Sequence, residues 1–426
     1  MKKALIIAYA FPPLQVSGSQ RPYRLAKYFP KFGWEPIVLT VKHPGISPEG
    51  IKVIKTDYKD VKGSFKSKFG FKPQKVLHEQ LDIAISKKYN DLTWKSKIIR
   101  LLKEIIAFPD SKIGWYKFAF KSASKFLLKE KIDVIISTSP PVTTHLIARK
   151  LSKKYKIPWL ADLRDPWAQL YADNKLGLIK YFDKRLATKT LNDADILVTV
   201  TKPQADVLKA LFKDKKVFCI TNGYDTDDFP EKSLKLTDKF TITHTGKFCK
   251  GERDPSLLFG VVTNLIKKNR IKKDLIEIKF YGKKEDWLLE EINKYNLEGV
   301  VDLCGLIPRQ KVLERQRESQ LLLLLRLNNE KEKGDCPAKL FEYFGARRPI
   351  VATGGYGGII KDFLEETNAG KFAENSDMLE NIILEHYQEF IQFGEVKYYC
   401  NDNIENYTYN SITKKYSEIL KMFLLN

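Results

Sequence analysis

Apolar residues recur along the chain as short continuous runs separated by amphipathic stretches. Most runs have four to seven residues, which is typical of strands in a parallel sheet that is covered on both faces. Between them, apolar residues return every three or four positions, and this period predicts helices. The runs of the first half are residues 4–10, 36–40, 51–56, 133–139, 159–163, 195–201 and 217–223; those of the second are 240–246, 276–282, 301–305, 321–327, 349–354 and 370–374.

The repeated strand–helix order predicts an α/β protein with a doubly wound sheet in each half. A chain of 426 residues is also too long for one ordinary core. The polar stretch 222–239 is the expected linker. We predict an N-terminal domain over 1–228 with a helical basic insertion at about 60–131, a second domain over 229–395, and a helical segment over 396–426 that crosses back to the first domain.

Ligands of such sheets bind beyond the carboxyl ends of the strands, so the residues that follow strands are the first candidates for a site. Gly18 stands after the first strand and just before a helix. A glycine there lets backbone N–H groups approach a phosphate at the helix N-terminus. An ordinary N-cap turn built on Ser17 and Ser19 explains the same residues.

Two further candidate stretches lie in the second half. Gly246 ends a strand, and Lys247 and Arg253 follow it in a loop, where two cations suit a diphosphate or form a solvated basic loop. Lys339 and Glu342 are three residues apart on one helix face. The Glu342 carboxylate either pairs with a nearby cation or accepts hydrogen bonds from a ribose, as acidic residues do in dinucleotide-binding folds.

In chain order these stretches resemble the retaining glycosyltransferases of family 4, which have the GT-B architecture of two Rossmann-like domains facing across a cleft. The resemblance covers nearly the whole chain. It rests on "FPPLQVSGSQRPYRLAKYFPKFGWEPIVLT", "ITNGYDTDDF", "HTGKF" followed by Arg253, and "KLFEYFGARRPIVAT". The stretches "DVIISTSPPVTTHLIARKL" and "IPWLADLRDPW" resemble a branch that acts on surface polysaccharides and lipid-linked saccharides.

The resemblance implies roles for the candidate residues. Lys247 and Arg253 would hold the donor diphosphate and stabilise it as it leaves, and Glu342 would hold the ribose with Lys339 nearby. The backbone groups of Gly18 and Gly246 would lie at the phosphates, and Gly357 beside the sugar. The implied donor is a nucleoside diphosphate sugar, most simply of UDP or GDP type. Transfer would proceed with retention, with no essential metal and no further cofactor.

The sequence departs from the family pattern at two places. Gly334, next to Asp335, stands where the family often has a second Glu that contacts the transferred sugar. The phosphate-binding pair has the order Lys247 then Arg253, the reverse of the usual order. The first departure leaves the sugar undefined, and the second preserves charge while changing geometry.

Candidates for the acceptor side follow strands of the first half. Asp162, Arg164 and Asp165 belong to "DLRDPW", where they either contact acceptor hydroxyls or form an internal Arg–Asp pair that shapes the loop. Ser139 occupies the position where some family members carry a catalytic His, so a backbone or hydroxyl contact is expected there.

Positive charge is concentrated in the first half. Residues 1–200 contain 38 Lys and Arg against 17 Asp and Glu, a net +21, whereas residues 201–426 contain 36 against 35, a net +1. Either a lysine-rich composition or a polyanionic partner accounts for this. We find no nucleic-acid-binding motif, so we expect an anionic membrane surface, reached by amphipathic helices around 94–131 with Trp94 and Trp115 as anchors. An amphipathic helix packed on the sheet is the alternative.

The remaining signals concern location and rival functions. Five scattered cysteines predict reduced thiols and no zinc site. We expect a cytoplasmic enzyme, peripheral on the inner face of the plasma membrane, that glycosylates a lipid-linked or polysaccharide acceptor. A nucleotide-sugar epimerase of the same fold and a non-catalytic saccharide-binding protein remain alternatives, the latter because of Gly334.

Overall fold

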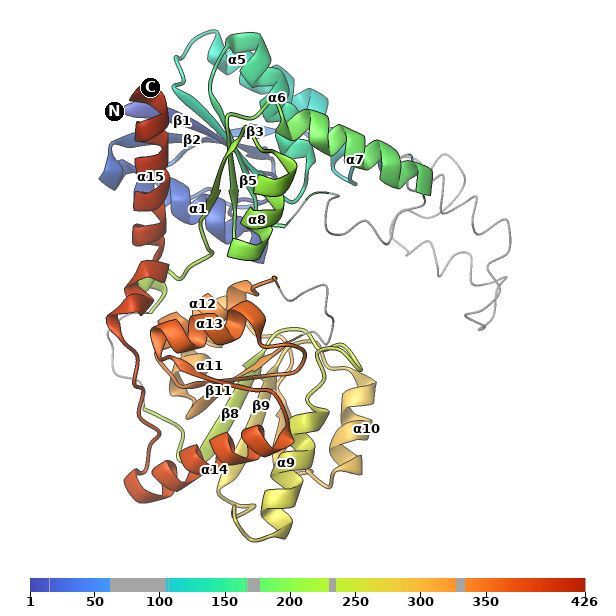
Figure 1. Cartoon of the computed structure of the whole chain (residues 1–426), viewed down its shortest axis with the longest axis vertical. Coiled ribbons are helices and arrows are strands. Elements are labelled where there is room, and N and C mark those ends of the chain that lie inside the picture. The colour runs from blue at the N-terminus through green and yellow to red at the C-terminus, as the bar shows by residue number, and fades with distance from the viewer. Residues whose placement is uncertain are drawn as a thin grey trace. The chain divides into compact units, whose positions relative to one another are not determined.

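The computed structural model describes residues 1–14, 16–61, 105, 107–165, 167, 177–229, 235–326 and 334–425. The chain divides into two compact units, shown in Figure 1. Unit 1 contains Met1–Ile220 and Thr413–Asn426, and unit 2 contains Thr221–Ile412. No helix among these described residues is long and apolar enough to span a bilayer.

Unit 1 is built on a seven-stranded sheet of order β3-β2-β1-β4-β5-β6-β7. All neighbouring strands run parallel. Their buried apolar residues match the continuous runs of the sequence, as expected for strands covered on both faces. The strands are β1 (Lys2–Ile7), β2 (Trp34–Val41), β3 (Lys52–Thr56), β4 (Val134–Ser139), β5 (Trp159–Leu163), β6 (Ile196–Thr199) and β7 (Lys216–Cys219).

One face of this sheet is covered by α5 (Tyr116–Leu127), α6 (Thr143–Tyr155), α7 (Gly177–Leu191) and α8 (Lys202–Leu211), whose buried residues form one core with the strands. The unit also contains α1 (Ser17–Tyr28), the 3-10 helices η1 (Phe29–Phe32) and η2 (Ile113–Trp115), and most of α15 (Tyr409–Leu425). Helix α15 is tied to β2, because Trp34 Nε1 donates to Ser417 Oγ at 3.0 Å.

Unit 2 repeats this plan with a six-stranded parallel sheet of order β10-β9-β8-β11-β12-β13. The strands are β8 (Phe240–Thr245), β9 (Ile276–Tyr281), β10 (Val301–Leu303), β11 (Leu321–Leu325), β12 (Ile350–Thr353) and β13 (Gly370–Ala373). Helices α9 (Ser256–Lys267), α10 (Asp286–Lys294) and α14 (Ser376–Phe393) share one core with the strands. A second core contains α12 (Ala338–Ala346), α13 (Gly358–Thr367) and η6 (Asp402–Tyr407). Helix α11 (Arg309–Glu318) and η4 (Thr226–Asp228) complete the unit.

The structure confirms the predicted pair of doubly wound α/β domains. It divides the chain after Ile220 rather than after residue 228. The reason is that Tyr224 pairs with the segment before α15: its N–H donates to the Tyr407 carbonyl at 3.0 Å, and Tyr409 N–H donates back to the Tyr224 carbonyl at 2.8 Å. The chain rejoins unit 1 at Thr413.

The expected membrane-facing segment is only partly described. Trp94, together with the basic residues around it, lies outside the described residues. Trp115 was a wrong choice as an interfacial anchor. Its side chain is fully buried in the core of unit 1, and its indole N–H donates to Thr56 Oγ1 at 2.6 Å.

Candidate functional site

The loop after β8 forms one wall of the candidate site in unit 2. Gly246 has a φ of 131°, a region that residues with a β-carbon rarely adopt. A β-carbon at this position would overlap the Lys339 ammonium group. The absence of a side chain at Gly246 therefore allows Lys339, on the first turn of α12, to reach the carboxyl end of β8.

Lys339 meets a buried histidine at this edge. The His244 ring lies at the end of β8, and its Nδ1 is 2.9 Å from the Leu323 carbonyl. Because a carbonyl only accepts, Nδ1 carries the proton and Nε2 is left as an acceptor. Lys339 Nζ lies 3.3 Å from that Nε2. Burial, reinforced by the Lys339 charge, holds the pKa of His244 well below its usual value, so the ring stays neutral.

The same surroundings act on Lys339. Desolvation, with a contribution from the Arg253 charge, lowers the pKa of Lys339 to about 7, while Glu342 opposes the shift. Two cationic groups thus converge near the carboxyl end of β8 with too little anionic charge to balance them. An arriving diphosphate would relieve this repulsion.

The structure pairs these cations differently from the sequence-based prediction. Arg253 is electrostatically coupled to Lys339, and the Lys247 side chain is exposed to solvent. The loop is shaped by its backbone, since Cys249 N–H donates to the Arg253 carbonyl at 3.2 Å. The prediction placed Lys339 only near the ribose, and the close approach to Gly246 gives it a second role as a phosphate-side cation.

Glu342 lies one turn after Lys339 on α12 and is held by an arginine that the sequence analysis missed. Arg309, the first residue of α11, donates from Nη1 to Glu342 Oε1 and from Nη2 to Asp228 Oδ2, the latter at 3.0 Å. The Glu342 side chain is 27% exposed, and within the described part of the chain its second carboxylate oxygen has no hydrogen-bond partner. Arg309 therefore fixes one oxygen and leaves the other available to a ligand hydroxyl. The clue in the sequence is that Arg309 also follows a strand, β10, at the same sheet edge.

Two more predicted positions lie at this edge. Gly357 directly precedes α13, and a β-carbon there would sit 3.2 Å from Lys361 and Phe372. Asp335, next to Gly334, accepts from Arg326 Nη1 through its backbone carbonyl at 2.6 Å. The Asp335 carbonyl thus anchors the chain just before α12.

In unit 1, Arg164 gathers several of the predicted residues. Its guanidinium donates to the Ser139 carbonyl at 2.8 Å, the Gly18 carbonyl at 2.7 Å and the Pro140 carbonyl at 3.0 Å. Gly18 lies in the first turn of α1, and Ser139 ends β4. The Ser139 side chain is buried, and its hydroxyl finds no hydrogen-bond partner among the described residues. Arg164 therefore braces the loops of this edge by binding their backbones.

Asp162 is a correction to the predicted acceptor contacts. It lies inside β5, is 1% exposed, and accepts from Arg21 at 3.0 and 3.1 Å, from Thr138 at 2.8 Å and from Tyr416 at 2.8 Å. Burial alone would raise the pKa of Asp162, but Arg21 and these hydrogen bonds outweigh burial and lower it. A carboxylate satisfied on this scale holds the interior together and has no face left for a substrate. Asp165, beyond the strand, is exposed.

Comparisons with known proteins agree with this architecture. Residues 19–228 match the sequence profile of Glycosyltransferase Family 4. The chain has the GT-B fold. Together, the match and the fold support a GT-B glycosyltransferase. No curated protein matches the chain in sequence.

Solved glycosyltransferases superimpose on nearly the whole chain. Sucrose-phosphate synthase (tll1590) from Thermosynechococcus elongatus has a TM-score of 0.62 at 12% identity, with 100% of both chains covered. TarM has a TM-score of 0.61 at 16% identity, with 99% of both chains covered. Anabaena HepE in complex with UDP and glucose has a TM-score of 0.59 at 13% identity, covering 99% of this chain and all of that one.

Proposed function

We propose that the protein transfers a sugar, with retention of configuration, from a nucleoside diphosphate sugar to a lipid-linked or polysaccharide acceptor. The observation that carries the proposal is the cluster in unit 2: Lys339 and Arg253 electrostatically coupled beside Gly246, with the Glu342 carboxylate one turn further along α12. A nucleoside diphosphate presents a doubly charged group and a ribose diol at a similar spacing.

Each residue of the cluster has a role in this reaction. Arg253 and Lys339 bind the diphosphate and stabilise the negative charge that grows on it as the sugar departs. Lys247 contributes from the exposed side of the same loop, and the free oxygen of Glu342 accepts hydrogen bonds from the ribose. The acceptor proton goes to the leaving phosphate, so no protein base is required.

UDP is the favoured nucleotide. HepE has been crystallised with UDP-glucose, and TarM with UDP and alpha-GlcNAc-glycerol. The excess of positive charge in residues 1–200 favours an acceptor at an anionic membrane, on the cytoplasmic face.

Calorimetry with UDP- and GDP-sugars tests the donor site. Glu342→Gln should weaken donor binding by about 1.5–3 kcal/mol, the range for a hydrogen bond to a charged group. Glu290, an exposed residue of α10, provides the matched control as Glu290→Gln. Equal donor affinity of the wild type and Glu342→Gln would refute the ribose assignment.

Product analysis tests the reaction class. Incubation with donor alone should give slow hydrolysis with release of UDP, whereas an epimerase would convert the sugar within an intact nucleotide. If the protein binds donor but neither hydrolyses nor transfers it above background, the catalytic proposal is wrong and a binding protein remains.

A further inference from the structure

Helix α7 has apolar residues on two sides, although only one side packs on the sheet. Ile179, Ala187 and Leu191 are buried toward the core of unit 1. Elsewhere on the helix, Leu178, Tyr181 and Phe182 are 75%, 58% and 56% exposed. A helix that is apolar beyond its buried stripe is expected to contact a second apolar partner.

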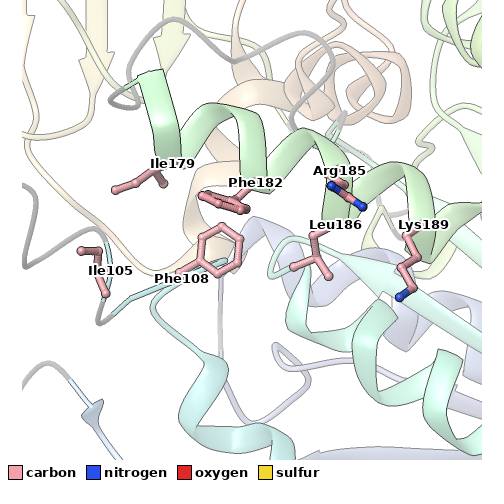
Figure 2. A pocket seen from close by; sticks show the side chains of 7 residues that line it. All are labelled: Ile105, Phe108, Ile179, Phe182, Arg185, Leu186 and Lys189. Atoms are coloured by element: carbon pink, nitrogen blue, oxygen red, sulfur yellow. The ribbon is translucent and has the colours of Figure 1, made fainter.

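A pocket of about 440 Å³ lies along this second side, between α7 and the segment that precedes η2. Figure 2 shows Phe182 of α7 over Phe108, with Arg185 and Lys189 toward one end of the pocket. The volume falls in the range of pockets that accept small organic ligands. The lining residues are Ile105, Phe108, Ile179, Phe182, Arg185, Leu186 and Lys189.

The charges around the pocket have one sign. In the described part of the chain, Lys184, Arg185 and Lys189 pair with no carboxylate. The single acid of α7, Asp183, is buried and accepts from Trp167 Nε1 at 3.0 Å. The solvent side of α7 is therefore cationic.

The neighbouring helix continues this cationic surface. A second groove, of about 550 Å³, lies against α6 and is lined by Arg149, Lys150, Lys153 and Lys154 together with Ile113, Tyr116 and Leu146. Asp193 pairs with Arg149 and Lys153, whereas Lys150 and Lys154 lie over the Phe120 ring at 4.3 and 5.5 Å. Both grooves belong to the helical layer that covers the same face of the sheet (Figure 1).

The partner must satisfy the apolar pocket and the cations together. A nucleic acid or an acidic polysaccharide would use the lysines and leave Phe108 and Phe182 exposed, and an uncharged apolar partner would leave the cations unused. An anionic lipid has both parts, a hydrocarbon chain and a phosphate.

We propose that α7 docks unit 1 on an anionic phospholipid surface, with acyl chains entering the Phe108–Phe182 pocket and lipid phosphates lying over Arg185 and Lys189. The inference rests on the proposed membrane-borne acceptor and assigns attachment to α7.

Co-sedimentation of the full chain with vesicles tests this docking. One set of vesicles is pure phosphatidylcholine, and the other is an equal mixture of phosphatidylcholine and phosphatidylglycerol. The protein should sediment with the mixed vesicles only, and high salt should release it. Arg185→Glu with Lys189→Glu should lower the partition coefficient at least about 30-fold, since each basic residue contributes about 1 kcal/mol. Phe182→Ser should lower it about tenfold or more.

Matched control variants lie in unit 2. Phe393→Ser alters a phenylalanine of similar exposure, 54%, and Lys267→Glu with Arg270→Glu alters two exposed cations. Both should sediment like the wild type. UDP-sugar affinity should stay unchanged in all variants, so loss of sedimentation with intact donor binding separates this docking from the donor site.

Other occupants of the pocket predict different outcomes. If another part of this chain fills it, Phe182→Ser lowers the melting temperature without lipid, Phe393→Ser does not, and sedimentation is unchanged. If a second copy fills it, Phe182→Ser converts a dimer to a monomer in light scattering. Either outcome overturns the proposal, as does equal sedimentation of the α7 variants and the wild type.

Discussion

The carboxyl edges of the two sheets use similar residues for opposite purposes. In unit 1, Asp162 and Arg164 follow or end a strand, and both are saturated by partners from the protein itself. In unit 2, Arg253 and Lys339 repel one another, and Glu342 keeps one oxygen without a partner among the described residues. Satisfied charges stabilise a fold, whereas unbalanced charges at an accessible edge are prepared for a ligand.

Removing the buried carboxylate should separate the two edges most clearly. Asp162→Ala leaves Arg21 buried without its counter-ion, so the free energy of unfolding should fall by about 3–5 kcal/mol. Urea denaturation measures this loss. Calorimetry at a temperature where the variant is folded should give wild-type donor affinity. If Asp162→Ala proves as stable as the wild type, the structural role assigned to Asp162 is wrong.

Removing a cation from the unit 2 edge should reverse this pattern. Arg253→Ala should reduce turnover about 10²–10³-fold, the cost of losing one group that stabilises developing negative charge. Thermal stability should change little. The matched variant Lys247→Ala removes an exposed cation of the same loop and should have a smaller effect on kcat. The opposite order of the two effects would restore Lys247 as the principal phosphate ligand.

The lowered pKa of Lys339 makes donor binding depend on pH. Above pH 7 the free protein increasingly holds this lysine neutral, and a bound diphosphate requires it charged, so affinity should fall by up to about tenfold per pH unit. The sign for folding is opposite. Between pH 7 and the ordinary lysine pKa of 10.5, the unfolded chain binds more protons, so this group makes stability rise with pH.

Calorimetry in buffers of different ionisation enthalpy measures the proton uptake directly. Near pH 8 the wild type should take up close to one proton on binding. Lys339→Arg keeps the charge at every accessible pH and should bind donor without proton uptake. Uptake that is identical in the two proteins would assign the linkage to another group.

The smallest effect is expected at Arg309, which orients Glu342 and makes no proposed contact with the donor. Arg309→Gln should weaken donor binding by about 0.5–1.5 kcal/mol, less than Glu342→Gln. In the double variant the two losses should not add, because Arg309 acts through Glu342. Additive losses would mean that Arg309 touches the donor itself.

Much of the fold was predictable because continuous apolar runs are a local property of the sequence. The strands of both sheets lie within or beside the predicted runs, and the doubly wound order follows from their alternation with helices. The division between units was less accessible, since it depends on Tyr224 pairing with Tyr407 and Tyr409. Such long-range pairing leaves no periodic signal near residue 224.

Site residues were predictable by position and not by environment. The rule that ligands lie beyond strand ends found Gly246, Lys339 and Glu342, which the structure brings to one edge. It could not distinguish Asp162, because the arginine that neutralises it stands on α1 and its tyrosine partner on α15. Trp115 failed for a related reason: an indole near lysines suits a membrane interface, but this one fills the core.

The return of α15 has a consequence for the order in which the protein is made. Tyr416, near the end of the chain, donates to Asp162 and accepts from Arg21, so the polar centre of unit 1 needs a residue that leaves the ribosome almost last. Unit 2 is contiguous in the sequence and has all its residues beforehand. Although domains commonly fold from the N-terminus during synthesis, here the first unit to emerge is the last whose residues are all available.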